Sequence, residues 1–316
     1  MKTTKSNLSF VFPGQGSQKI GMLRDFSSEE TVRVTFSEAS EVLGYDVWAL
    51  IQKGDPSSIN LTARTQPILL CCSLALWRLW SVRGGRTPDY LGGHSLGEWS
   101  ALVCAEVISF KDALSVVEER GSLMQSAVPE GEGAMAAVIG LQDHAVLECC
   151  EQAQTDGVVS AVNFNAPGQI VIAGAANGVN KAISLCKKAG ARRTVFLPVS
   201  APFHTMLMRP AADRLTQTLA DINFSCPKIP VIHNVHGCFE HNPEGIKAAI
   251  LKQIYSPVLW VHCVERLINE GTNVFVECGP GGVLSGLIRR IDKNIQAYTL
   301  STIESFESAL STTSDK

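Results

Sequence analysis

The sequence predicts an α/β fold, because strand-like and helix-like stretches alternate along most of its 316 residues. Apolar residues make up 45% of the chain, which excludes intrinsic disorder. At roughly 100–200 residues per domain, this length corresponds to one large domain or two modest ones. Such a chain can bury a full hydrophobic core without disulfides or metal ions to hold it together.

The elements outside the middle of the chain are predicted from apolar runs and from the residues that end them. The first run stops at Pro13-Gly14, as a buried strand does, and the second is long enough to favour a buried helix. In chain order we expect a strand at residues 8–12, a helix at 66–83, a short strand at 89–92, a helix from residue 95, a helix at 111–127 and a buried strand at 273–278.

The middle of the chain has a different order of elements. We expect a strand at residues 134–139, a helix at 142–154, strands at 158–164 and 169–173 joined by a turn at 165–168, a helix at 177–189 and a strand at 193–199. This β-α-β-β-α-β order is the ferredoxin-like arrangement. We therefore predict a large α/β domain formed by residues 1–130 and 200–316, interrupted by a ferredoxin-like subdomain at residues 131–199.

Charge and cysteine placement limit the partners and the compartment. The net charge of −3 disfavours nucleic acid or an anionic membrane as a partner. Two pairs among the ten cysteines are adjacent and no C-x-x-C occurs, so a disulfide scaffold is not expected. The longest apolar stretch, residues 68–77, has half of the ~20 residues of a membrane span, and residues 8–12 are too few for a signal-peptide core. We expect a soluble protein of the cytoplasm.

The sharpest motif is Gly93-His94-Ser95-Leu96-Gly97, a G-x-S-x-G between a predicted strand and a predicted helix. The two glycines permit a tight, strained turn that presents the serine hydroxyl at the start of the helix. There the helix dipole and the free N–H of Leu96 can stabilise an oxyanion. This placement favours a nucleophilic Ser95 over a chance match at an ordinary strand-to-helix turn.

A serine nucleophile needs a general base, and the chain contains seven histidines. His94 lies beside Ser95, where neighbouring side chains diverge, so we expect it to support the turn. His204 lies in a loop that leaves the last strand of the inserted subdomain, and such loops commonly present catalytic side chains. His204 is therefore the candidate base, with other histidines as alternatives.

Three further features are weak signals on their own. The histidines and the cysteine between residues 233 and 241 have spacings that fit no metal-ligand pattern, so no metal site is expected. The glycine-rich turn at residues 12–18 lacks the P-loop and dinucleotide fingerprints, and it fits a structural turn as well as a binding site. Arg120 lies in a predicted helix of mixed character, where a lone arginine usually forms a surface ion pair.

Six segments, considered together and in their order along the chain, indicate a family resemblance that no single one of them establishes. They are FPGQGSQ at residues 12–18, GHSLGE at 93–98, NFNAPGQ at 163–169, PFH at 202–204, QIYSPVLW at 253–260 and ECGP at 277–280. In this order they resemble the malonyl-CoA:acyl carrier protein transacylases, and the resemblance spans residues 8–300. It implies an α/β-hydrolase-like large domain with a parallel sheet core and an inserted ferredoxin-like subdomain, which agrees with the segmentation above.

The resemblance also implies roles for the residues that match the family's motifs. Ser95 would be the acylated nucleophile and His204 the base, with Gln253 orienting His204 through its backbone carbonyl. The backbone N–H groups of Gln15 and Leu96 would form the oxyanion hole. The substrate-binding residues implied by the resemblance are Arg120, Phe203 and Asn163.

Two of these roles bear on substrate choice. Arg120 would pair bidentately with the malonyl carboxylate, which displaces the interpretation as a surface ion pair. Phe203 would crowd the carbon between the two carbonyl groups, so we expect malonyl to be preferred over methylmalonyl. His233 and His236 flank Asn234 where we would expect the family to carry other polar residues, and no role is assigned to them.

The resemblance implies an acyltransferase that moves malonyl from malonyl-CoA to the phosphopantetheine thiol of acyl carrier protein, by ping-pong exchange through a Ser95-linked acyl-enzyme, for fatty acid synthesis. Malonyl-CoA is then a substrate, no cofactor is expected, and we expect a monomer. One alternative is a stand-alone acyltransferase that serves a polyketide synthase. Others are a serine acyl-thioesterase or hydrolase and a non-catalytic module that binds carrier protein, which the intact Ser95 and His204 disfavour.

Overall fold

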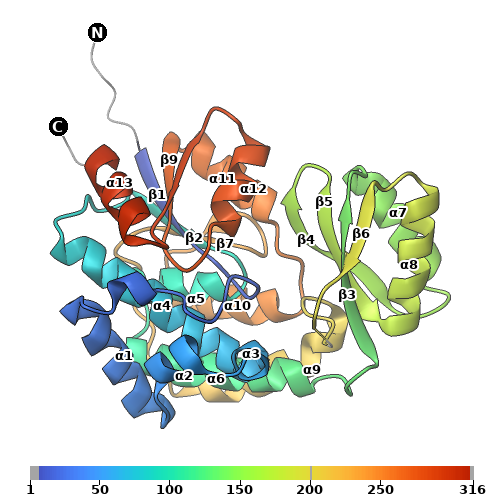
Figure 1. Cartoon of the computed structure of the whole chain (residues 1–316). Helices are drawn as coiled ribbons and strands as arrows, with labels where there is room; N and C mark the ends of the chain where they lie inside the picture. Colours follow the sequence, from blue (N-terminus) through green and yellow to red (C-terminus); the bar gives the residue numbers. More distant parts are fainter. Residues whose placement is uncertain (1–6, 200, 314–316) are drawn as a thin grey trace.

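The computed structural model describes residues 7–199 and 201–313, and its central layer is a six-stranded sheet in the order β10-β9-β1-β2-β7-β8 (Figure 1). Neighbouring strands are parallel except for the pair β7 and β8. The strands are β1 (Asn7–Phe12), β2 (Tyr90–Gly93), β7 (Val231–His233), β8 (Cys238–Phe239), β9 (Thr272–Glu277) and β10 (Gln296–Thr299). Because parallel strands end at the same edge, the loops after β1, β2 and β9 meet there.

Helices cover both faces of this sheet, which is why β1 is buried along nearly its whole length. Phe10 and Phe12 project to one face and pack in the main core, whereas Val11 projects to the other and packs with α11 and α12. The helices are α1 (Glu30–Leu43), α2 (Val47–Lys53), α3 (Pro56–Asn60), α4 (Thr62–Val82), α5 (Leu96–Cys104), α6 (Phe110–Ser126), α9 (Arg209–Ala220), α10 (Pro243–Ile254), α11 (Trp260–Asn269), α12 (Val283–Ile291) and α13 (Ile303–Thr313). Within the described residues, no helix has the length and apolar content that crossing a lipid bilayer requires.

A second, antiparallel sheet lies beside the first, at the right of Figure 1. Its order is β4-β5-β3-β6, and two helices pack on it around a separate core. The elements are β3 (Gly133–Ile139), α7 (Asp143–Ala153), β4 (Val159–Ala166), β5 (Gln169–Ala175), α8 (Ala176–Lys188) and β6 (Arg193–Phe196). Their order along the chain confirms the predicted β-α-β-β-α-β arrangement within an α/β fold. The domain limits stay a prediction, and residues 1–6, 200 and 314–316 lie outside the described residues.

Four predicted element limits were wrong by two residues or more, and one of them is the end of β5, which reaches Ala175 and not residue 173. β4 continues through Ala166, so its turn to β5 contains only Pro167 and Gly168, and Gly168 supplies the positive φ of 68° that a tight turn needs. β6 ends at Phe196 and not at residue 199. Helix α4 begins at Thr62, four residues before the predicted start, because its first turn is polar in sequence although Thr62 is buried. No strand was predicted at β7, β8 or β10, which are too short to show a periodic pattern.

Candidate active site

Ser95 lies in a sharp turn between β2 and α5, with its backbone at φ 51° and ψ −107°. A residue other than glycine rarely adopts such a φ, so the turn is strained. The flanking glycines allow the close packing that the turn requires. A Cβ on Gly97 would lie 1.9 Å from the carbonyl oxygen of Phe12, and a Cβ on Gly93 would lie 1.9 Å from the carbonyl carbon of Gly97. The turn therefore presents Ser95 at the N-terminus of α5 in the way the motif predicts.

The Ser95 hydroxyl contacts the imidazole of His204, with Oγ 2.8 Å from Nε2. His204 Nδ1 lies 2.8 Å from the backbone carbonyl oxygen of Gln253. A carbonyl oxygen can only accept, so Nδ1 carries the proton and Nε2 accepts from the serine. Burial, followed by the charge of Arg120, lowers the pKa of His204 to about 3, so the ring is neutral at pH 7. A neutral imidazole that accepts from a serine hydroxyl can act as its general base.

Arg120 lies on α6 and is only 1% exposed, so the interpretation as a surface ion pair is wrong. Its Nη1 donates to Gln66 Oε1 at 2.7 Å, and its Nη2 donates to Gln253 Oε1 at 2.9 Å. Nη2 also lies 3.5 Å from Ser95 Oγ. Burial lowers the pKa of Arg120 to about 10, so the side chain stays cationic at pH 7. Two glutamine carbonyls thus hold a cation beside the hydroxyl, and no carboxylate within the described residues pairs with it.

A cavity of about 90 Å³ opens at the Ser95 hydroxyl. Its lining residues are Gln15, Gln66, His94, Ser95, Leu96, Arg120, Met124, Met135, Asn163, Leu197, Val199, Phe203 and His204. All the site residues predicted from the sequence line it except Gln253, which is fully buried and contacts His204 and Arg120. In the described part of the chain, the backbone N–H groups of Gln15 and Leu96 have no hydrogen-bond partner.

Three residues that the sequence analysis did not assign to the site form a buried polar network with Gln253. Glu98 Oε1 lies 2.7 Å from His233 Nδ1, and Glu98 Oε2 accepts from the backbone N–H of Asn234 at 2.9 Å and from Gln253 Nε2 at 2.8 Å. Asn234 Oδ1 in turn accepts from the backbone N–H of Ser95 at 2.7 Å. The available signal was Glu98 itself, the one charged residue of α5, in the first turn of that helix. Nothing local to residues 233 and 234 indicated that they reach the turn.

The remaining histidines and cysteines singled out in the sequence have structural contacts and form no further site within the described residues. His94 Nε2 lies 2.8 Å from Asn165 Oδ1 and its ring packs edge-on against Trp260, so the residue braces the turn. His236 is exposed and contacts Glu240 at 3.2 Å. Residues 7–199 and 201–313 contain no group of three or more metal-ligating side chains. All ten cysteines are free thiols.

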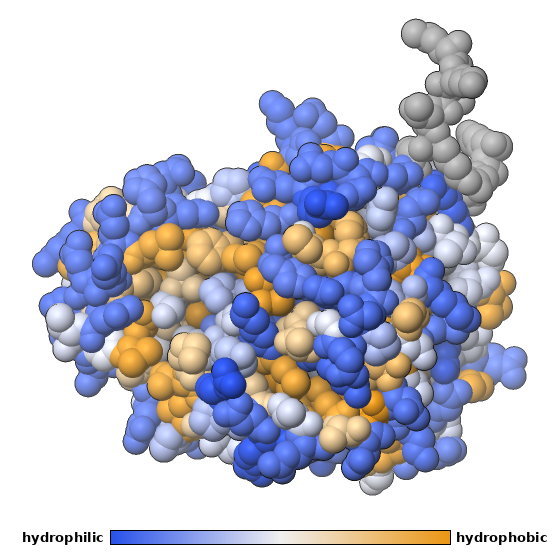
Figure 2. Space-filling model, turned by 180° about the vertical axis from the view of Figure 1, so that it is seen from behind, coloured by the Kyte–Doolittle hydropathy of each residue, from blue (hydrophilic) through white to orange (hydrophobic). Residues whose placement is uncertain are grey.

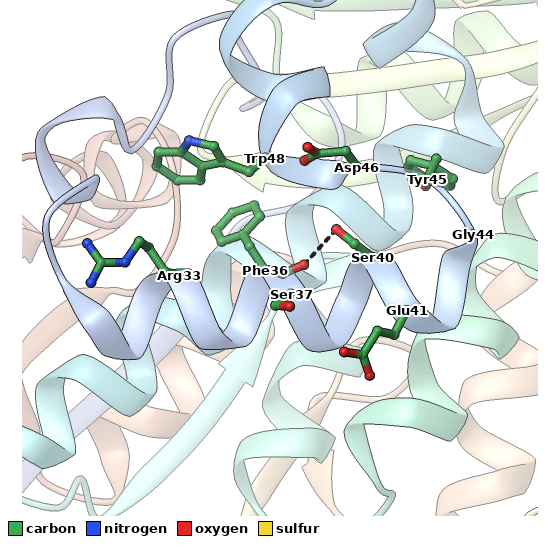
Figure 3. A pocket seen from close by; sticks show the side chains of 9 residues that line it. All are labelled: Arg33, Phe36, Ser37, Ser40, Glu41, Gly44, Tyr45, Asp46 and Trp48. Carbon is green, nitrogen blue, oxygen red and sulfur yellow. Dashed lines mark hydrogen bonds between the residues drawn. The ribbon is translucent and has the colours of Figure 1, made fainter.

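A larger groove, of about 570 Å³, lies between α1 and the start of α2 (Figure 3). Phe36 and Trp48 pack edge-to-face in it, with ring centroids 4.9 Å apart. The Ser40 hydroxyl donates to the Phe36 carbonyl at 2.7 Å, so it is already bonded to the helix. None of the nine lining residues forms a nucleophile–base pair. We therefore place the candidate site at the smaller cavity.

Comparisons with known proteins show the family of the chain. Residues 9–303 match the family model described as the acyl transferase domain. A malonyl CoA-acyl carrier protein transacylase of Escherichia coli is 50% identical over 306 residues, which cover 96% of this chain and 99% of the relative. The crystal structure of an acyl carrier protein S-malonyltransferase from Vibrio cholerae O1 has a TM-score of 0.94 at 52% identity, covering 96% of this chain and 99% of that one. A malonyl-transacylase solved with its type II PKS acyl-carrier protein has a TM-score of 0.96 at 48% identity, covering 97% of this chain and 100% of that one.

Proposed function

Because this chain belongs to the acyl transferase domain family, we propose that it transfers a malonyl group from malonyl-CoA to the phosphopantetheine thiol of acyl carrier protein. The observation that carries the proposal is a serine hydroxyl 2.8 Å from a neutral histidine, in a cavity that also contains a buried arginine. The serine and histidine supply a nucleophile and its base, and the arginine supplies a partner for a free carboxylate. A malonyl thioester has both the electrophilic carbonyl and the carboxylate that this cavity can bind.

In the first half-reaction, Ser95 Oγ attacks the thioester carbonyl carbon while His204 Nε2 accepts the hydroxyl proton. The unpartnered N–H groups of Gln15 and Leu96 hold the negative oxygen of the tetrahedral intermediate. When the intermediate collapses, the carbon–sulfur bond breaks and His204 returns the proton to the departing CoA thiolate. A malonyl ester on Ser95 remains.

In the second half-reaction, the phosphopantetheine thiol attacks this ester while His204 accepts the thiol proton. The carbon–oxygen bond breaks, and the proton goes to Ser95 Oγ. Both half-reactions use the same cavity, so the exchange is ping-pong. The Gln253 carbonyl keeps the His204 proton on Nδ1 throughout, which is the orienting role that a carboxylate has in a Ser-His-Asp triad.

Arg120 selects acyl groups with a free carboxylate and also acts on the base. Its charge is the second largest cause of the lowered pKa of His204. A malonyl carboxylate bound to Arg120 would offset this charge and raise the pKa of His204 within the substrate complex. A base of higher pKa accepts the serine proton more readily, so an acyl group with a carboxylate improves its own transfer.

A transfer assay tests the proposal and separates it from hydrolysis. The chain is mixed with malonyl-CoA and either holo carrier protein or the apo form, which lacks phosphopantetheine, and the carrier is weighed by mass spectrometry. We expect one malonyl group on the holo form and none on the apo form, and no transfer with Ser95→Ala. Free malonate released faster than the carrier is loaded would contradict the proposal and identify a serine hydrolase.

A second candidate is supply of a polyketide synthase, favoured by the similarity to a malonyl-transacylase solved with a type II PKS acyl-carrier protein. The catalytic chemistry is the same, so the two pathways differ only in the carrier. Loading rates on carriers from fatty acid and from polyketide systems distinguish them, and we expect the fatty acid carrier to be loaded faster.

We further propose that the enzyme needs no cofactor or metal ion and acts as a monomer in the cytoplasm, without a nucleic acid or membrane partner. The reaction above needs only side chains and backbone N–H groups of this chain, and a net charge of −3 offers no attraction to polyanions. On the face seen in Figure 2, hydrophobic residues are interspersed with hydrophilic ones. Light scattering on the purified protein tests the oligomeric state.

A further inference from the structure

The mechanism leaves His233 unused, although this histidine is fully buried close to the site. It lies at the end of β7, and its Nδ1 is 2.7 Å from Glu98 Oε1. A carboxylate accepts, so Nδ1 donates the bond. Its Nε2 is buried and has no partner within the described residues. The contact with Glu98 is therefore the one polar interaction of this side chain, and it holds the carboxylate from one side.

The Glu98 carboxylate is fully buried in the first turn of α5, directly after the serine turn. The bond from His233 occupies Oε1, while Oε2 accepts from the backbone N–H of Asn234 and from Gln253 Nε2. The helix N-terminus also stabilises a negative charge at this position. With donors on both oxygens, the carboxylate has one favourable orientation.

Gln253 transmits this orientation to the reacting groups. Its Nε2 donates to Glu98 Oε2 at 2.8 Å and to the Ser95 carbonyl oxygen at 3.0 Å, which leaves Oε1 to accept from Arg120 at 2.9 Å. If the amide turned over, its NH₂ group would face the Arg120 guanidinium, and two donors would meet. The acceptors around Nε2, of which Glu98 Oε2 is the nearest, therefore fix the amide orientation that Arg120 requires. The backbone carbonyl of the same residue holds His204.

We propose that His233 and Glu98 form a buried positioning pair that sets the orientation of the Gln253 amide and, through Gln253, places both Arg120 and His204. His233 and Glu98 do not line the cavity, so they act through their neighbours and not on the substrate. The proposal rests on the proposed function only for the choice of acyl donor.

Two substitutions of His233 separate its donor from its volume. His233→Asn keeps a donor, because Asn Nδ2 stands at the position of His Nδ1, but it leaves part of the space empty. His233→Leu fills the space and removes the donor. We expect His233→Asn to keep kcat for malonyl transfer within about threefold of wild type and His233→Leu to lower it about tenfold or more. The opposite order would overturn the proposal, because it would show that His233 only fills space. His144→Leu, at an exposed histidine on α7 away from the site, is the matched control and should leave kcat unchanged.

A second readout does not depend on malonyl-CoA. A small alkyl fluorophosphonate labels an activated serine by forming an Oγ–P bond as fluoride leaves, with His204 accepting the serine proton. We expect the labelling rate of Ser95 to follow the same order as kcat, with His233→Leu about tenfold slower than His233→Asn. Equal labelling rates would overturn the proposal. If wild type labels but transfers no malonyl, the proposed function fails while the comparison between variants still stands.

Glu98→Gln tests the pair independently and keeps it testable if His233→Leu does not fold. It preserves volume but removes one acceptor, so either the His233 proton must move from Nδ1 to the unpartnered Nε2 or the new NH₂ group faces the donors of Asn234 and Gln253, and we expect kcat to fall about tenfold or more. If the two residues act as a unit, kcat of the double variant Glu98→Gln/His233→Leu should be no lower than kcat of the worse single variant. Unchanged kcat in Glu98→Gln, or losses that multiply in the double variant, would overturn the pairing.

Discussion

Replacing Arg120 with alanine should separate malonyl transfer from acetyl transfer, because only the malonyl group has a carboxylate for the guanidinium to bind. The cation is 1% exposed and already oriented by the carbonyls of Gln66 and Gln253, so an incoming carboxylate meets a fixed partner. A hydrogen bond to a charged group contributes about 1.5–3 kcal/mol. Two such bonds correspond to about 3–6 kcal/mol, or roughly a hundredfold to ten-thousandfold in kcat/KM for malonyl transfer.

The assay compares kcat/KM for malonyl-CoA and acetyl-CoA with one carrier protein. For Arg120→Ala, acetyl transfer should change by less than about tenfold while malonyl transfer falls by the larger factor. Arg120→Lys keeps the charge without the planar fork, so its malonyl loss should be intermediate. Arg209→Ala removes an exposed arginine from α9 and serves as the control that leaves both rates unchanged. Equal losses for the two acyl groups would refute the assignment of Arg120 as the selector.

Three further outcomes follow from the geometry. Folding lowers the pKa of His204 from 6.5 to about 3. Between these two pH values the unfolded chain binds a proton that the folded chain does not, so the free energy of unfolding falls as the pH falls. Wild type should lose up to about 3 kcal/mol of stability between pH 7 and pH 4.5. His204→Asn keeps the donor to Gln253, tolerates the φ of 65° and removes the titrating ring, so urea unfolding should show a smaller loss for it; an equal loss would contradict the cause assigned to the pKa. Gly97→Ala should lower the free energy of unfolding by about 3 kcal/mol, because the added Cβ meets the backbone at the end of β1. Gly286→Ala on α12 has no atom within 4 Å of the added Cβ and should be neutral or stabilising. Similar melting temperatures for the two variants would contradict the packing argument. Phe203→Leu should raise the ratio of methylmalonyl to malonyl kcat/KM about tenfold, and an unchanged ratio would show that Phe203 does not limit the substituent.

Local patterns were sufficient for most of the architecture. The β-α-β-β-α-β order of the second sheet follows from strand and helix lengths between turn residues, and the serine turn follows from the spacing of Gly93 and Gly97. The shortest strands could not be predicted, because a strand such as β8, with only two residues, shows no periodic pattern. The start of α4 was predicted wrongly because Thr62 is a polar residue type in the sequence although its side chain is buried in the structure.

The site could be predicted only where a residue lay inside a recognisable segment. Ser95 is defined by its neighbours, whereas His204 was favoured among seven histidines only by its place in a loop, and the other histidines stayed open until the family resemblance was considered. Arg120 alone suggested a surface residue, and only the packing of α4 against α6, which brings Gln66 to it, buries the charge. The contact between Glu98 and His233 spans 135 residues and joins a helix to a strand, so no local pattern contains it.

Transfer through Ser95 requires a covalent malonyl-enzyme intermediate, which can be measured directly. The chain is mixed with excess malonyl-CoA without carrier protein, quenched in acid and digested, and the peptide that contains Ser95 is weighed. We predict one malonyl group on Ser95 for each chain, release of one CoA, and loss of the label when holo carrier protein is added. An unlabelled wild type, or a label that persists in Ser95→Ala, would contradict transfer through Ser95.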